Sequence, residues 1–173
     1  MALTLYDAFV PTCEQTLAAI HGMMDKAQSF IAEKGLTDAD LIEAQLSDDM
    51  WPLPWHIRSC WLHSANVLEQ LPSGQFSPNF NEIVESWDEL RAQVTSAQTI
   101  LANVNADELE AITDTEVGFV MGGKTLMKFT AQNMLLSFSQ PNFHFHATTF
   151  YDILRHKGVP LGKRDYLGVS RTL

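Results

Sequence analysis

Two groups of histidines, far apart in the chain, are the side chains best suited to chemistry. His56 and His63 are seven residues apart, and Cys60 lies four residues after His56. On an α-helix this spacing places all three side chains on one face, in the manner of a ladder of metal ligands. Packing explains the same pattern, because a histidine beside an aromatic residue such as Trp55 is often a buried ring with one bonded nitrogen. Metal ligation and packing are therefore both open for His56 and His63.

The second group lies near the C-terminus. Asn142 and His146 are four residues apart and share a helical face, whereas His144 points elsewhere. A zinc-type site needs neutral imidazoles or carboxylates that converge from different helices, usually three or more of them. Asn142 is a poor substitute for such a ligand, so a buried polar contact between Asn142 and His146 is the alternative. Either way, the sequence predicts a pocket between helices that His56, Asn142 and His146 line.

Two further groups of reactive side chains have structural explanations. Cys13 and Cys60 fall at apolar positions of predicted helices, so we expect buried, reduced thiols that pack in the core. His156 stands between two basic residues in the last turn before Gly158, where positive charge complements the helix dipole. Helix termination accounts for His156 without a catalytic role.

Composition limits the class of protein. With 173 residues and 46% hydrophobic content, the chain is expected to form one compact domain over residues 1–173. Its net charge of -10 argues against a nucleic-acid partner, because phosphate binding depends on clustered Lys and Arg. No apolar run approaches the ~18 residues of a membrane span, and the first residues do not resemble an export signal. We therefore expect a cytoplasmic protein that does not contact membranes.

Apolar residues recur at helical spacing in three segments of the first two-thirds of the chain. The first covers residues 10–34 and ends at Gly35, although an earlier start near Thr4 is equally open because Pro11 suits either a first turn or a kink. A second helix follows Pro54 and continues to about Leu71. The third, over residues 81–103, has a single apolar stripe that runs from Ile83 to Val104.

Two short runs, residues 116–121 and 124–129, flank the pair Gly122-Gly123, which suits a tight hairpin turn. Thr130 is then expected to cap a final helix that Pro141 interrupts. Amphipathic helices without alternating strand–helix units are best buried against one another. The sequence therefore predicts an all-α protein, an antiparallel four-helix bundle with a short β-hairpin before the last helix.

The C-terminal tail, residues 159–173, follows Gly158, which ends the last helix. Residues 155–173 carry five basic side chains and one acid, Asp165, whereas the remainder of the chain is strongly acidic. A cationic segment attached to an acidic body is attracted to it, and the tail also has apolar residues. We expect the tail from Val159 to about Gly168 to pack on the bundle or on a partner subunit.

Five stretches of the sequence together carry a resemblance to known proteins. They are Leu5-Tyr6-Asp7, Met50-Trp51-Pro52-Leu53, Pro141-Asn142-Phe143, Tyr151-Asp152-Ile153-Leu154-Arg155-His156 and Gly158-Val159-Pro160-Leu161-Gly162-Lys163-Arg164-Asp165-Tyr166-Leu167-Gly168. With these stretches the chain resembles an uncharacterised family, catalogued as a domain of unknown function, within the DinB/YfiT-like superfamily of metalloenzymes. The resemblance implies an up-down four-helix bundle, usually homodimeric, in which three histidines of the better-known relatives bind a divalent metal. Some of those relatives are thiol-dependent transferases or isomerases.

The resemblance also implies roles for individual residues. His56 corresponds to the histidine of the second helix, His146 to the second member of the paired His-x-x-x-His of the last helix, and Asn142 to its first member. An amide in place of one ligand implies a degenerate metal site, which His63 or His144 could restore only through a distorted helix or a rearranged ligand shell. The leading hypothesis is a non-catalytic or uncharacterised bundle protein with a small inter-helix pocket that is open to a small-molecule ligand. The alternative is a Zn- or Ni-dependent enzyme of the thiol-transferase or isomerase type.

The tryptophans suggest an interface. Trp51, Trp55, Trp61 and Trp87 exceed what a single bundle core of this size easily encloses, and an exposed aromatic patch marks an interaction surface. We therefore predict a homodimer through helix faces. The alternative is that the tryptophans cap the ends of the bundle.

Overall fold

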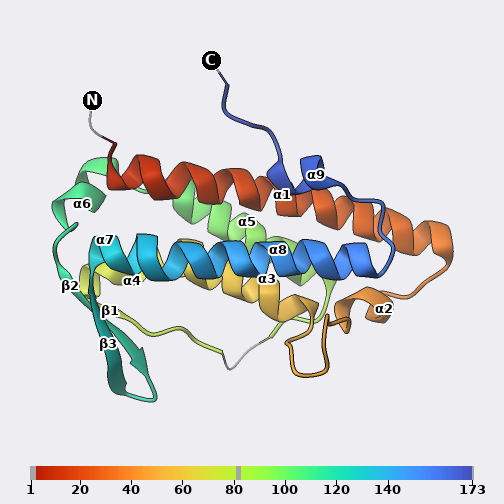
Figure 1. Cartoon of the computed structure of the whole chain (residues 1–173), viewed down its shortest axis with the longest axis horizontal. Helices are drawn as coiled ribbons and strands as arrows, with labels where there is room; N and C mark the ends of the chain where they lie inside the picture. The colour runs from red at the N-terminus through yellow and green to blue at the C-terminus, as the bar shows by residue number, and fades with distance from the viewer. Residues whose placement is uncertain (1–2, 81–82, 173) are drawn as a thin grey trace.

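The computed structural model describes residues 3–80 and 83–172 of the chain. Most of this part is helical, and a small three-stranded sheet lies near one end of the helices (Figure 1). Among the described residues, no helix is both long and apolar enough to cross a membrane. The sequence predicts this mostly helical structure, whose main helices are α1 (Leu5–Lys34), α3 (Leu53–Trp61), α5 (Trp87–Ala102) and α8 (Gln140–His156).

The first helix, α1, begins directly after Thr4, whose side chain accepts a hydrogen bond from the backbone N–H of Asp7 at 3.0 Å. This cap satisfies one of the free donors of the first turn. The earlier of the two predicted starts is therefore correct, and Pro11 lies inside the helix. The helix ends at Gly35, whose φ of 65° is left-handed and favours glycine. Its 30 residues offer the other helices a long buried face.

The connection after α1 contains the short helix α2 (Ala39–Ile42) and leads to α3. The helical path continues past α3, as predicted, until Gly74, but it is not a regular α-helix throughout. A π-helical turn holds more residues than an α-helical one, so it changes the face on which the following residues lie. The continuation consists of the π-helical segment η1 (Leu62–Asn66), the helix α4 (Val67–Gln70) and the 3₁₀ turn η2 (Leu71–Ser73).

The helix α5 starts later than the apolar stripe predicts. The predicted start at Asn81 lies outside the described residues, and Ile83 precedes the helix instead of standing on its buried face. The reason is local: Ser86 has an extended backbone, and its side chain accepts a hydrogen bond from the N–H of Glu89 at 3.3 Å. A short helix, α6 (Ala106–Ala111), follows α5.

The last helical segment runs through Pro141 without a break, so the predicted interruption is wrong. Thr130 does cap this segment, as predicted, by accepting a hydrogen bond from the N–H of Asn133 at 3.2 Å. Pro141 is the second residue of α8, one residue after the end of a π-helical segment, and this segment accommodates the change of hydrogen bonding that a missing N–H imposes. The segment comprises α7 (Ala131–Asn133), η3 (Met134–Ser139) and α8.

The predicted hairpin is present as β2 (Glu116–Met121) and β3 (Lys124–Thr130), which pair antiparallel around two glycines with positive φ. A third strand, β1 (Gln75–Phe76), pairs with β2 in parallel, so the sheet is mixed and has the order β1-β2-β3. The sequence does not indicate β1, because two residues are too few to show alternation.

The four main helices do not alternate in direction. The helix α1 packs against α5 and α8, and α3 packs against the same two helices. In Figure 1, α1 and α8 run one way and α3 and α5 run the other way. The chain between α4 and α5 returns along the length of the molecule, which lets these two consecutive segments point the same way. The predicted antiparallel four-helix bundle is thus not confirmed in its simple up-down order.

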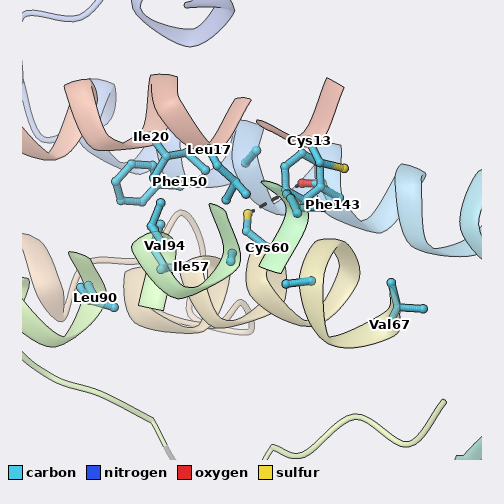
Figure 2. Packing of buried hydrophobic residues seen from close by; sticks show 14 of the residues in the cluster. Cys13, Leu17, Ile20, Ile57, Cys60, Val67, Leu90, Val94, Phe143 and Phe150 are labelled. Atoms are coloured by element: carbon cyan, nitrogen blue, oxygen red, sulfur yellow. Dashed lines mark hydrogen bonds between the residues drawn. The ribbon is translucent and has the colours of Figure 1, made fainter. Parts of the chain in front are cut away.

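The helices bury a shared apolar core at their contacts. Figure 2 shows side chains of α1, α3, α5 and α8 that point toward one another, among them Leu17, Ile57, Val94 and Phe150. The thiol of Cys60 donates to the carbonyl of Phe143 at 3.9 Å, and Cys13 is equally buried. Both cysteines are free, and burial raises the pKa of both thiols far above the ordinary value. They are buried reduced thiols, as predicted.

The tail returns along α1. Val159 and Leu161 are buried, and the short helix α9 (Lys163–Leu167) lies on α1 (Figure 1). Lys26 pairs with Asp165 at 2.7 Å. At the end of α9, an added Cβ on Gly168 would approach the α1 backbone within 3.3 Å, so only glycine fits this close contact without adjustment.

Two phenylalanines of α8 provide a test of the core. Phe143 is fully buried, whereas Phe145 is 54% exposed. We expect Phe143→Ala to lower the free energy of unfolding by about 3–5 kcal/mol, because it leaves a cavity in a packed core. Phe145→Ala on the same helix is the matched control and should change it by much less. Urea unfolding at pH 7.5 measures both, and equal losses would contradict the described core.

The tail offers a second test. We expect truncation after Gly158 to lower the free energy of unfolding by about 3 kcal/mol or more, because it removes the buried side chains of Val159 and Leu161. Truncation after Gly168 keeps α9 and serves as the control. Thermal unfolding of both proteins decides the matter, and a stable protein without α9 would show that the tail contributes nothing to the fold.

Candidate histidine site between α3 and α8

The two histidines that the sequence analysis selects as ligands meet in the structure. His56 lies in α3 and His146 in α8, two helices that pack directly against each other. Their Nδ1 atoms are 3.0 Å apart, and the side chains are buried, with 2% and 8% of their surface exposed. This contact joins positions 90 residues apart in the sequence.

The hydrogen bonds around the pair decide which nitrogens carry hydrogen. His56 Nε2 lies 3.0 Å from the carbonyl oxygen of Trp51, which can only accept, so Nε2 of a neutral His56 is the donor. His56 Nδ1 then accepts, and His146 Nδ1 must donate to it. The remaining nitrogen, His146 Nε2, has no hydrogen-bond partner among the described residues. The pair therefore has one nitrogen that can accept a further hydrogen bond.

Burial keeps these imidazoles neutral. Desolvation lowers the pKa of His56 below its ordinary value and lowers that of His63 to about 4. The pKa of His146 falls to about 3, first because of burial and then because His56 and His63 lie close by. All three rings are neutral at pH 7, the state in which imidazole accepts a hydrogen bond or binds a metal.

His63 joins the cluster from the π-helical segment η1. Its ring is nearly parallel to that of His146, at an angle of 6° and with centroids 6.4 Å apart. Its Nδ1 lies 3.4 Å from the hydroxyl of Ser139, in η3. His63, which the helical spacing places on the same face as His56, thus stands in the same cluster.

The other two predicted pocket residues do not join the imidazoles. Asn142 donates its amide hydrogen to the carbonyl of Phe138 on the same helix at 2.7 Å. The hydrogen bonds of the described residues do not connect Asn142 to His146, which was the expected polar contact. His144 is half-buried, and its ring lies edge-on to that of Phe143, with centroids 5.5 Å apart.

Aromatic side chains cover the cluster on its outer side, a feature that the sequence analysis missed. Trp51 is 45% exposed and stacks on His146, with ring centroids 6.1 Å apart. The exposed Phe145 lies edge-on to His146 at 5.1 Å. Trp55 and Phe80 pack on Trp51, at 5.0 and 5.9 Å. The sequence signal for this cover is the aromatic neighbour of each histidine, Trp55 before His56 and Phe145 before His146.

The tryptophans only partly form the exposed patch expected from their number. Trp87 is buried at the start of α5 and takes no part in any surface. Trp61 is half-buried beneath the guanidinium of Arg58, 4.7 Å from its ring centre. Trp51 therefore provides the largest described exposure of an indole, and this surface borders the histidine cluster.

The residues present fit a metal ion only in part. Two nitrogens bound to one zinc ion at ~2.0–2.1 Å stand about 3.3 Å apart, close to the observed 3.0 Å. The bond from His56 Nε2 to a backbone carbonyl also orients the ring as ligating histidines are oriented. Yet no group of three His, Cys, Asp or Glu side chains in the described part of the chain is arranged to hold a metal. The described residues supply a pair of donors and not a complete set of protein ligands.

The burial of the histidines in their neutral form predicts that the stability of the protein depends on pH. Since the pKa values of His63 and His146 in the folded protein lie below the ordinary 6.5, the unfolded chain binds protons first as pH falls. Their stabilisation is complete above about pH 6.5 and disappears as pH falls toward 4 and 3. When the pH falls from 7.5 to 5.5, each ring should lower the free energy of unfolding by about 1.4 kcal/mol.

We expect His146→Phe to reduce this loss by about one ring's share, whereas His156→Phe, at an exposed position, should leave it unchanged. Urea unfolding at the two pH values measures the difference. A pH dependence that His146→Phe does not alter would contradict the neutral, buried state of this ring.

Comparison with known proteins agrees with this architecture. Residues 5–167 match the family described as "Domain of unknown function (DUF1993)". The chain is similar to the crystal structure of a DinB family member protein from Shewanella denitrificans, with 28% identity and a TM-score of 0.81 over 98% of this chain and 94% of that one. A search of curated proteins finds no significant match. The predicted resemblance is confirmed: the chain belongs to the domain-of-unknown-function family DUF1993 and has a DinB-like fold.

Proposed function

We propose that this protein binds a small molecule at the histidine cluster between α3 and α8, and that the cluster is a degenerate metal site. The observation that supports this function is the 3.0 Å contact between His56 and His146, which commits three of their four nitrogens and leaves His146 Nε2 as an acceptor. The complementary ligand donates a hydrogen to Nε2. Because aromatic rings cover the site, the donor group belongs to an aromatic or otherwise apolar molecule.

Binding suits these residues better than acid–base catalysis. A general base works best when its pKa lies near the working pH, and the pKa values of His63 and His146 are about 4 and 3. The two thiols are poor nucleophiles as well, because Cys13 and Cys60 are buried and their pKa values are raised. Neutral acceptors in an apolar surrounding favour recognition of a hydrogen-bond donor.

The second candidate is a divalent-metal-dependent enzyme of the thiol-transferase or isomerase type, with Zn or Ni held by His56 and His146. Their nitrogen spacing and the backbone bond of His56 favour it. The missing third protein ligand and the amide of Asn142, which bonds along its own helix, weigh against it. In such an enzyme the thiol would have to come from the substrate, since both cysteines are buried.

The same proposal includes the arrangement of the helices, the location of the protein in the cell and its partners. The DinB-like similarity supports a four-helix bundle in which two pairs of helices run in opposite directions. The two free, buried cysteines support a reducing, cytoplasmic location. Contact with nucleic acid is disfavoured by the net charge of -10.

Nitrogen-15 NMR of histidine-labelled protein tests the leading function. At pH 7 we expect hydrogen on Nε2 of His56 and on Nδ1 of His146, with His146 Nε2 unprotonated. Phenol at millimolar concentration is a suitable probe, because it combines an aromatic ring with a hydroxyl donor. It should shift the His146 Nε2 resonance, and His146→Phe should abolish the binding, whereas His144→Phe should not. An unchanged resonance at saturating phenol would count against the proposed site.

Metal analysis separates the two candidates. We expect protein purified without a histidine tag or chelators to contain less than about a tenth of an equivalent of metal, and Zn or Ni to leave the thermal midpoint unchanged. A ligand that binds only the folded state must raise this midpoint. One equivalent of metal, together with a thermal shift that His56→Gln and His146→Gln abolish and His144→Gln preserves, would favour the enzyme.

A further inference from the structure

The outer part of the β2–β3 hairpin exposes apolar side chains that have no cover within the described chain. The register places Met121 opposite Lys124 and Met127 opposite Phe119, so both methionines and Lys124 lie on one face of the hairpin. Leu126 is the extra residue of a bulge and is 57% exposed. Figure 1 shows the hairpin projecting away from the helices. Such a surface is expected where a partner binds.

A groove with complementary properties lies where α4, η2, α5 and α6 meet. It has a volume of about 670 Å³, and the hairpin does not line it. Two exposed carboxylates, Glu69 and Glu108, belong to its wall, and its lining includes neither Lys nor Arg. Its apolar lining comprises Leu68, Pro72, Ile100, Val104, Leu109, Ala111 and Ile112.

The hairpin and the groove match in chemistry. The hairpin presents three apolar side chains and the ammonium group of Lys124, and the groove presents an apolar floor and two carboxylates. Methionine is a flexible side chain that fills irregular apolar surfaces, which suits a groove of this kind. We propose that the hairpin of one copy of this chain binds in the groove of a second copy, with Lys124 facing Glu69 and Glu108.

One feature favours a second copy of the chain as the partner, and another favours contact through side chains over the addition of a strand to the sheet. Both complementary surfaces belong to one chain, so two copies can exchange hairpins and close a two-fold dimer. Addition of a strand to the outer edge of β3 is disfavoured, because a bulge and the two lysines Lys124 and Lys128 occupy that edge strand. This contact is distinct from the histidine cluster and does not depend on the proposed ligand.

A charge exchange tests the contact in the full-length protein. We expect sedimentation of the wild type to show a dimer at micromolar concentration. Lys124→Glu and Glu108→Lys should each raise the dissociation constant by about tenfold or more, because each brings like charges together. The double variant should recover to within about threefold of the wild type. Lys163→Glu makes the same charge change on α9 and should leave the dimer intact.

Three results would overturn the proposal. The first is a wild type that stays monomeric up to about 100 μM. The second is a dimer that neither Lys124→Glu nor Glu108→Lys weakens. The third is a double variant that dissociates as much as the single ones, since restored pairing is what the proposed contact requires. Circular dichroism of each variant confirms that a loss of dimer does not reflect unfolding.

Discussion

The packing of α3 against α8 brings imidazoles into a core that is built mainly from apolar side chains. Burying a polar ring there is costly unless the ring is neutral and its nitrogens are bonded. The chain meets this constraint with a short series of bonds, from His146 to His56 and from His56 to the carbonyl of Trp51. The series also ties the loop before α3 to the last helix. The same bonds that make burial tolerable thus fix the loop, the orientation of both rings and the one nitrogen that stays available.

The same constraint shapes what the site can do. Low pKa values remove His63 and His146 from acid–base work near neutral pH, and burial keeps both cysteines as thiols. What remains is a neutral acceptor beneath aromatic rings, of which Trp51 and Phe145 are exposed to solvent. Asn142, at the position where the resemblance implies a histidine, donates its amide hydrogen to a carbonyl of the preceding helical turn. Fold similarity to a DinB family member therefore does not by itself transfer metal chemistry, because that chemistry depends on the number and direction of ligands.

The histidine cluster and the two surfaces of the proposed contact differ in character. The histidine cluster is buried within the helical core, whereas the hairpin and the groove of α4, α5 and α6 are open surfaces of matching chemistry. The proposed association and the proposed ligand binding use different side chains, since Lys124 and Glu108 take no part in the bonds of the histidine cluster.

The sequence by itself determined the helical nature of the protein and the hairpin, because these rest on local periodicity and on glycine and capping residues. His56 and His146 became paired ligand candidates through the resemblance to a known family. Thr130 and Gly35 mark helix ends that backbone chemistry sets locally. It did not determine the start of α5, the passage of a helix through Pro141 or the strand β1, which tertiary packing and π-helical turns decided. The meeting of His56 with His146 depended on two helices that run in opposite directions, and the cover by Trp51 depended on a loop. Side chains 90 residues apart come within 3.0 Å only through packing, and no spacing in the sequence encodes that distance.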